Sequence, residues 1–222
     1  MEFREWNGQQ KILRSLFESG QDHSAALEFF MRQHSALHSS NINPPNNKSF
    51  SFEDLLLDDL DDELFRRKRA NDEHSIAWCI WHSARIEDVT MNRLVAGEPQ
   101  LFHKNSWADE LGFPAVHTGN AMTDDEMFDF CQHIQFEPLR AYRLSVGRRT
   151  QEIVGKLSQA DLKQKVLANR LKMIVEEEAI VQEAMGLVDY WAKRTIAGML
   201  LMPPTRHNMV HLNEAAKLKN KR

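Results

Sequence analysis

The stretch that decides the fold is Ile76-Ala-Trp-Cys-Ile-Trp-His-Ser-Ala-Arg-Ile-Glu-Asp88. It is the centre of the most hydrophobic helix candidate, which runs from about residue 72 to 95. That helix should stop near Gly97 and Pro99, because glycine and proline commonly end helices. Only 9 residues of the chain are glycine, and runs of alternating β-branched residues are nearly absent. The sequence therefore predicts an all-α protein.

Helical spacing, capping motifs and prolines divide the rest of the chain. Apolar residues recur at steps of three and four from about residue 21 to 39, and again from about 187 to 200. Three capping boxes predict helix starts, at Ser51–Asp54, Thr123–Glu126 and Ser158–Asp161. Pro138 should kink or divide the helix that the second box opens, which reaches about residue 157. We expect a four-helix bundle with extra short helices.

Three further segments carry their own predictions. The first capping box opens a short acidic helix that is followed by the basic residues 66–69, the order that the helix dipole favours. From residue 100 to 120 the helical pattern dissolves, and a loop of this length commonly forms a lid or a pocket wall. Pro203-Pro204 should break the chain, so that a final helix starts near Thr205.

Composition excludes several classes of protein. The net charge of -4 argues against nucleic-acid binding, which needs a basic face. No stretch reads as a signal peptide, and no run of about 18 apolar residues could span a membrane, so we expect a cytoplasmic protein. Cys79 and Cys131 stand in apolar contexts and are interpreted as buried free thiols. We expect one domain over residues 1–222, with its core at about 20–219.

Two histidine pairs have the spacing His-x-x-x-His, which puts both rings on one face of a helix. His34 and His38 lie at the end of a helix, where the dipole alone explains histidine. His207 and His211 are followed by Glu214 on the same stripe, which could orient an imidazole or be a fourth ligand. This second pair is the better candidate for a metal site. The isolated histidines are expected to have no such role: His23, His103, His117 and His133.

A third ligand must come from elsewhere in the chain, and His82 is the best candidate. Its helical neighbours Trp78, Cys79, Ile86 and Val89 are apolar, so its ring should point into the bundle core. A buried histidine must satisfy both ring nitrogens. A metal ion and a backbone carbonyl are both open as partners on these grounds.

Two of these segments resemble the DinB/YfiT-like superfamily. The stretch 76–88 is similar to its second-helix motif, and His207-Asn-Met-Val-His-Leu-Asn-Glu-Ala-Ala-Lys-Leu218 is similar to its last helix. The stretches 139–150 and 157–162 resemble its third helix and the following turn, so the resemblance spreads over roughly residues 20–219. It departs from the family at Pro203-Pro204, which would put His207 in the first turn of a helix, and at Asn213, near which relatives often have glycine.

The resemblance implies a four-helix bundle that holds one divalent ion, most often nickel or zinc, with His82, His207 and His211 as its ligands. It further implies a homodimer and an activity such as thiol S-transfer with a low-molecular-weight thiol. Arg85, Tyr142 and Arg143 are the candidates for a substrate pocket. Two alternatives remain open, a metal-dependent hydrolase and a non-catalytic metal-binding or stress-related bundle.

Overall fold

The computed structural model describes residues 3–47, 49–69, 74–104 and 106–220. Its longer helices are α1 (Phe3–Ser19), α2 (His23–Leu37), α5 (Ile76–Asp88), α8 (Asp124–His133), α9 (Phe136–Val154), α11 (Ala168–Glu176) and α14 (Asn208–Asn220). The shorter ones are η1 (Ser40–Ile42), η2 (Pro45–Asn47), α3 (Phe52–Leu57), α4 (Asp62–Arg66), η3 (Val89–Ala96), α6 (Leu101–Lys104), α7 (Trp107–Leu111), α10 (Gln159–Lys163), η4 (Gln182–Ala184), α12 (Gly186–Ala192), α13 (Ile196–Leu200) and η5 (Met202–His207). Within the described ranges, β-structure is limited to one isolated bridge between Lys165 and Thr195.

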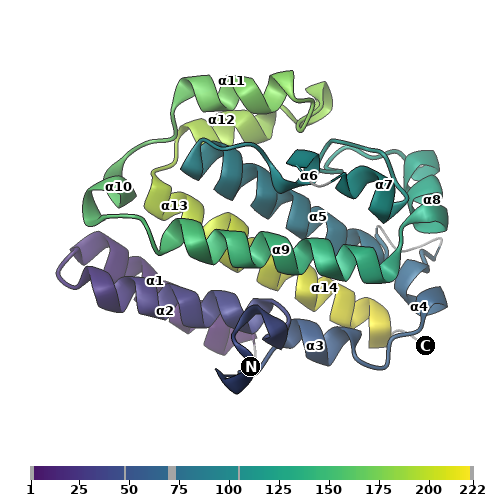
Figure 1. Ribbon diagram of the computed structural model, residues 1–222, viewed down its shortest axis with the longest axis horizontal. Helices are drawn as coiled ribbons and strands as arrows, with labels where there is room; N and C mark the ends of the chain where they lie inside the picture. Colours follow the sequence, from purple (N-terminus) through teal and green to yellow (C-terminus); the bar gives the residue numbers. More distant parts are fainter. Residues whose placement is uncertain (1–2, 48, 70–73, 105, 221–222) are drawn as a thin grey trace.

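Four helices form the central bundle, as the sequence predicted. Helix α5 packs against both α9 and α14, and α2 contacts these same two helices from the other side. Figure 1 shows α5, α9 and α14 running side by side, with α2 below them. Helix α1, for which the sequence pattern gave no prediction, pairs with α2. The all-α fold is therefore a four-helix bundle with additional helices around it.

Helix α5 lies at the centre of the bundle. Every residue from Ile76 to Asp88 is buried, which explains why this stretch is apolar around its whole circumference. The hydroxyl of Ser75 caps its first turn by accepting a hydrogen bond from the Trp78 amide. The helix continues as the π-helical segment η3 and ends at Gly97, whose φ of 76° is accessible to glycine at little cost. The predicted end of this helix is confirmed.

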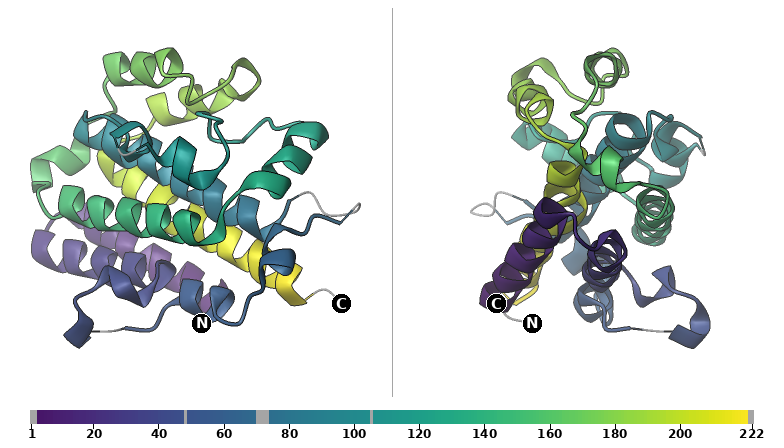
Figure 2. Two further views of the ribbon diagram at one scale, coloured as in Figure 1. Left: turned by 45° about the vertical axis from the view of Figure 1, so that its right-hand side comes forward. Right: turned by 90° about the vertical axis from the view of Figure 1, so that its left-hand side faces the viewer.

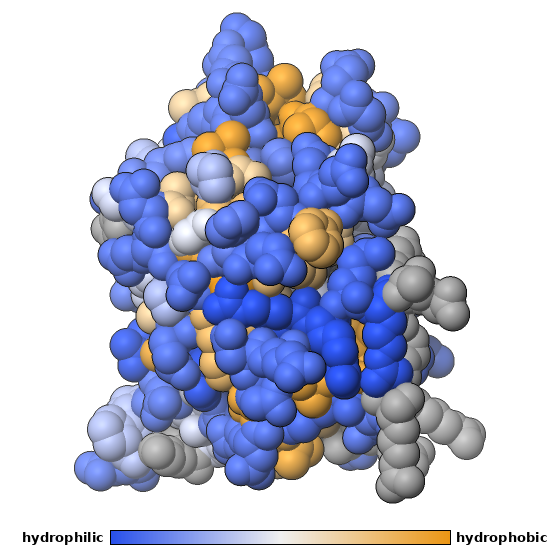
Figure 3. Space-filling view, turned by 90° about the vertical axis from the view of Figure 1, so that its right-hand side faces the viewer, coloured by the Kyte–Doolittle hydropathy of each residue, from blue (hydrophilic) through white to orange (hydrophobic). Residues whose placement is uncertain are grey.

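The outer helices cover two regions of the bundle (Figure 2). Helices α11 and α12 lie over one end of it, and α6, α7 and α8 lie beside α5 toward the other end. The carboxylate of Asp88 accepts hydrogen bonds from the amides of Leu101 and Phe102, and so supports the start of α6. Figure 3 shows one face, on which hydrophilic residues dominate and apolar ones are scattered. None of the described helices is both long and apolar enough to cross a membrane.

Several predicted boundaries are confirmed and others are wrong. The boxes at Thr123 and Ser158 start α8 and α10, and the predicted long helix divides before Pro138, which lies in the first turn of α9. The predicted loop at 100–120 contains α6 and α7, because Phe102 and Trp107 anchor these short helices in the core. The predicted acidic helix is two helices, α3 and α4, separated at Asp59, whose φ is 62°.

The chain also does not break at Pro203-Pro204. It stays helical through η5 into α14, and both prolines are buried at the start of η5. Proline is tolerated there because the first residues of a helix need no amide hydrogen bond. The Leu200 carbonyl would accept from residue 204 in an α-helix, and the hydroxyl of Thr205 donates to it instead, at 2.9 Å. His207 is consequently the last residue of the π-helical segment η5 and does not lie in the first turn of α14.

Candidate metal centre

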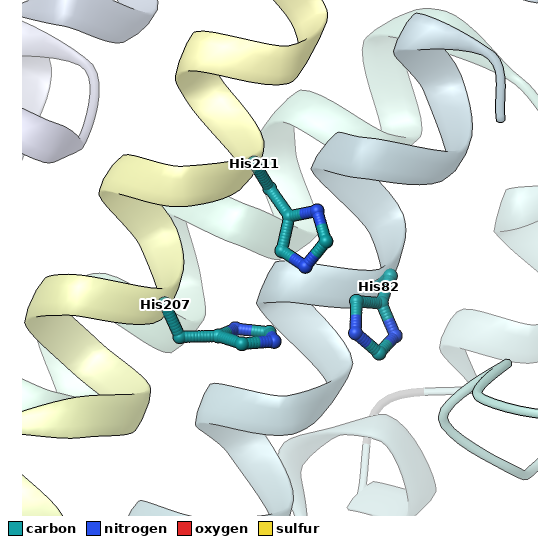
Figure 4. Close-up of side chains that lie close together, drawn as sticks. All are labelled: His82, His207 and His211. Carbon is teal, nitrogen blue, oxygen red and sulfur yellow. The ribbon is translucent and has the colours of Figure 1, made fainter. Parts of the chain in front are cut away.

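Three histidines from two contacting segments of the bundle lie together (Figure 4). His82 comes from the middle of α5, His207 from the end of η5, and His211 from the first turns of α14. One ligand nitrogen of each ring lies within 4.8 Å of the others. The ring centroids are 5.0 Å apart for His82 and His207, 4.8 Å for His82 and His211, and 4.5 Å for His207 and His211. The predicted convergence of the three rings is therefore present in the fold.

Hydrogen bonds fix which nitrogen of two rings is free. Nδ1 of His82 faces the backbone carbonyl of Thr118, and Nδ1 of His211 faces a carboxylate oxygen of Glu214 at 3.1 Å. A carbonyl and a carboxylate only accept hydrogen bonds, so both Nδ1 atoms carry the proton. Nε2 of each ring then holds a lone pair. This is the arrangement in which a metal-binding histidine donates its second nitrogen to an acceptor.

His207 differs because neither of its ring nitrogens has a hydrogen-bond partner among the described residues. Its Nδ1 is buried. A buried polar atom left without a partner costs roughly 1–3 kcal/mol, so such atoms are rare unless something else binds them. The ring of His207 therefore has free coordination capacity on the side where His82 and His211 present their lone pairs.

The environment keeps the imidazoles of His82 and His207 neutral. Burial lowers the pKa of His82 to about 3, and the neighbouring His211 adds to this effect. Burial, His82 and His211 together hold the pKa of His207 well below its ordinary value. A neutral imidazole is the form that binds a metal ion. These two rings therefore need not lose a proton before they coordinate a metal ion.

Glu214 joins the cluster to a fourth histidine that the sequence reasoning missed. Its second oxygen accepts from Nδ1 of His74 at 2.7 Å. Burial opposes ionisation of Glu214, yet hydrogen bonds from His211 and His74 bring its pKa well below the usual range. The ring of His74 stacks on Trp78 at 3.5 Å, and Trp78 stacks on His82 at 4.3 Å. The signal in the sequence was a stripe of rings at steps of four, at residues 74, 78 and 82.

The predicted buried thiol Cys79 lies beside this group. Its sulfur is within 4.8 Å of ligand atoms of His211 and Glu214. Burial raises the pKa of the thiol well above its ordinary value, and the nearby carboxylate of Glu214 adds to the rise. The thiol is therefore held protonated. Both Cys79 and Cys131 are free and buried, as expected.

The other histidine pair, His34 and His38, is explained by a buried carboxylate and not by the helix dipole. His34 and His38 each place Nε2 against one oxygen of Glu87, at 2.8 and 3.1 Å, and all three side chains are fully buried. Thr150 and Asn208 also donate to Glu87, at 2.7 and 2.6 Å. Burial disfavours the charge, but the two histidines bring the pKa of Glu87 well below its usual range. The carboxylate therefore accepts four hydrogen bonds, and Nε2 of both histidines is occupied by a proton.

This buried hub, formed by Glu87 and its four donors, reaches the metal candidate through Asn208. Asn208 follows His207 directly in the chain and is fully buried. Its side-chain amide donates to Glu87 and also contacts the Pro204 carbonyl at 3.3 Å. Helices α2, α5 and α9 thereby fix the point where η5 passes into α14, which positions His207.

The three residues predicted for a substrate pocket lie in the core instead. Arg85, Tyr142 and Arg143 have fully buried side chains. Arg85 donates to the Tyr142 hydroxyl, to Gln100 and to the Val116 carbonyl, and it lies over the ring of Phe102. Arg143 donates to Glu53, Ser83 and the Leu37 carbonyl. These groups join α5 and α9 to their neighbours, and apart from Nε of Arg85, which has no partner among the described residues, their hydrogen-bonding capacity is used there rather than presented to a ligand.

The histidines predicted to have no metal role have other contacts, which for His103 is the ring of Phe102. His23 bonds the Leu157 carbonyl and Gln159, and His133 bonds within its own helix to Asp129. His117 accepts from the Gly119 amide. None of them belongs to the clusters of ligand atoms found among the described residues.

The donor set fits a divalent transition metal. Imidazole nitrogen suits zinc and nickel, and three protein ligands leave further positions open. His82 is buried, whereas His207 and His211 are partly exposed, so one side of the cluster is reachable from solvent. Two of the three rings already have the hydrogen-bond acceptors that orient such ligands.

Comparison with known proteins agrees with this architecture. Residues 54–215 match the family model described as the DinB superfamily. A search of curated proteins found no match of significance. The matched segment includes His82, His207, His211 and Glu214, and it covers α5, α9 and most of α14. By this match over most of its length, the chain belongs to the DinB superfamily.

Proposed function

We propose that this protein binds one divalent transition-metal ion through His82, His207 and His211 and uses it to activate a low-molecular-weight thiol for transfer to an electrophile. Nickel and zinc are among the ions that an all-imidazole donor set suits. The proposal rests on one observation above all: three imidazoles converge, and at least one nitrogen of each has no hydrogen-bond partner among the described residues. Open coordination positions on a partly exposed side support a catalytic rather than a structural role.

A divalent ion in such a site would supply charge that lowers the pKa of a coordinated thiol or water. The chain's own residues do the rest. Thr118 and Glu214 hold the protons of His82 and His211 on Nδ1. Trp78 lies against His82 and makes an apolar wall beside the site. The thiol would give its proton to solvent, its sulfur would bond to the electrophilic carbon, and the leaving group would depart with the bonding electron pair.

The first test is elemental analysis of protein purified without a histidine tag. We expect about one transition-metal ion per chain, lost in His211→Ala and retained in the matched control His133→Ala, whose ring is exposed and bonds only within α8. Circular dichroism would check that both variants fold. Metal-free wild-type protein that cannot be loaded with zinc or nickel would refute the metal site.

The second test separates activities. Metal-loaded protein would be assayed with low-molecular-weight thiols and electrophiles, and separately with esters in the absence of thiol. Thiol consumption that disappears in His211→Ala supports the transferase. Ester cleavage without thiol would indicate a hydrolase, and silence in both assays at full metal occupancy would indicate a non-catalytic metal-binding protein.

A further inference from the structure

A second hollow lies away from the histidines, where α1, α10, α12, α13 and η5 meet. These elements gather at the end of the bundle that carries α10, on the left in Figure 1 and facing the viewer in the right-hand view of Figure 2. The cavity has a volume of about 550 Å³. This lies within the range of roughly 300–1,000 Å³ that small-molecule sites occupy.

The cavity is lined by an excess of positive charge. Five cationic side chains border it: Arg14, Lys163, Lys193, Arg194 and Arg206. Among the described lining residues, Glu18 is the single carboxylate. The whole chain has more acidic than basic residues, 32 against 28. The concentration of cations here therefore does not follow from composition.

These cations have no acidic partners among the described residues. None of the five forms an ion pair with a described residue, although many of the other lysines and arginines do so. Arg194 instead lies over the ring of Tyr190, 4.1 Å from its centroid. Like charges held around one hollow raise its positive potential, and apolar walls focus that potential. An anion is the ligand that would relieve this repulsion.

The floor of the cavity is apolar. Phe17 and Leu162 are buried beneath it, and Leu201 and Met202 are partly buried beside them. The hydroxyl of Thr195 accepts a hydrogen bond from the Gly198 amide, so its own proton is free to donate to an anionic oxygen. Charged oxygens are therefore what a ligand needs here, and an apolar portion would only add contacts with this floor.

A neighbouring cavity extends the same positive surface. It has a volume of about 490 Å³, it shares Arg14, Leu201 and Arg206 with the first, and it adds Lys11. A molecule with two separated anionic groups could contact both cavities across Arg14 and Arg206.

We propose that this pair of cavities binds a small anionic molecule that carries two or more phosphate or carboxylate groups. The site is distinct from the histidine cluster, and it does not require a metal there. Its concave shape favours a small molecule over a flat anionic surface such as a membrane.

Isothermal titration calorimetry on the full chain would test this, with inorganic pyrophosphate and citrate as probes and sodium chloride added to keep ionic strength constant. We expect saturable binding. Arg14→Gln and Lys193→Gln should each weaken it by about tenfold, because each removes one charged contact. Both side chains are exposed, so these variants should fold normally. The matched control is Lys172→Gln on α11, an exposed lysine that does not line either cavity.

Three results would overturn the proposal. The first is the absence of saturable binding for both probes into the millimolar range. The second is equal weakening in the Lys172→Gln control. The third is binding only to vesicles of phosphatidylcholine and phosphatidylserine, which would point to a membrane surface. Because the titrations can be run on metal-stripped and on metal-loaded protein, failure of this site and failure of the metal site are separate outcomes.

Discussion

Replacing Glu214 by glutamine tests how the fold holds His211 at the candidate metal centre. One oxygen of the carboxylate accepts a hydrogen bond from Nδ1 of His211 at 3.1 Å, and the other accepts one from Nδ1 of His74 at 2.7 Å. A glutamine has one amide oxygen, so it can serve only one of the two donors, and its NH₂ group repels the other. The substitution also removes a negative charge beside the candidate metal site.

The expected loss follows from this geometry. Removing an acceptor that orients a histidine ligand typically lowers metal affinity by about 10–100-fold, which is roughly 1.4–2.8 kcal/mol. Glu214 is about a third exposed, at 31% of its side-chain surface. Its loss should therefore change the free energy of unfolding of the metal-free protein by less than about 1 kcal/mol. Affinity should fall much more than stability.

The assay is competition for zinc with a chromophoric chelator, beside urea unfolding of the metal-free protein. Glu176→Gln is the matched control, an exposed carboxylate on α11 that pairs only with Lys172 among the described residues. Unchanged zinc affinity in Glu214→Gln, together with lost binding in His211→Ala, would refute the reasoning that Glu214 holds the ligand in place.

Two further outcomes concern the buried hub, and a third concerns His38 of the hub together with His82. Glu87→Gln should lower the free energy of unfolding by about 3–5 kcal/mol in urea titrations, because two of its four donors lose their acceptor inside the core; a loss under about 1 kcal/mol would contradict this. Gly147→Ala should destabilise by about 1–3 kcal/mol in the same assay, because its Cβ would lie 2.7 Å from Nδ1 of the hydrogen-bonded His38; unchanged stability would show that the ring can move. His38 and His82 have pKa values lowered to about 3 in the folded chain. The unfolded state therefore binds more protons below about pH 6.5, and stability of the metal-free protein should fall by about 2 kcal/mol per histidine between about pH 7 and pH 5; a flat profile of unfolding free energy would contradict the lowered values.

The sequence predicted the elements whose signals are local. Capping at Thr123 and Ser158, the end at Gly97 and the division before Pro138 depend on a few neighbouring residues, and all four are present. Boundaries failed where distant residues decide them. The helix α6 starts where Asp88 supplies a hydrogen-bond acceptor from α5, which no local pattern reveals.

The same distinction explains the candidate site. Residues His34/His38 and His207/His211 have identical spacing, yet the first pair faces the carboxylate of Glu87 and the second faces another imidazole. Arg85 lies one turn beyond His82 on the same side of α5, yet its guanidinium is bound by Tyr142 and Gln100 in the core. Spacing shows which residues share a helix face and does not show what that face meets.

The two histidine clusters are connected, and they differ in what lies between the rings. The hub has a carboxylate there, whereas the cluster of His82, His207 and His211 has space for a ligand. In the buried hub, a carboxylate accepts four hydrogen bonds, so the histidine nitrogens that face it are occupied, although Nδ1 of His34 and of His38 has no partner among the described residues. In the neighbouring cluster no carboxylate lies between the rings, and Glu214 binds from outside. Asn208 ties the closed cluster to the residue after His207. The closed cluster can therefore hold the open one rigid, which is what a metal site with few protein ligands requires.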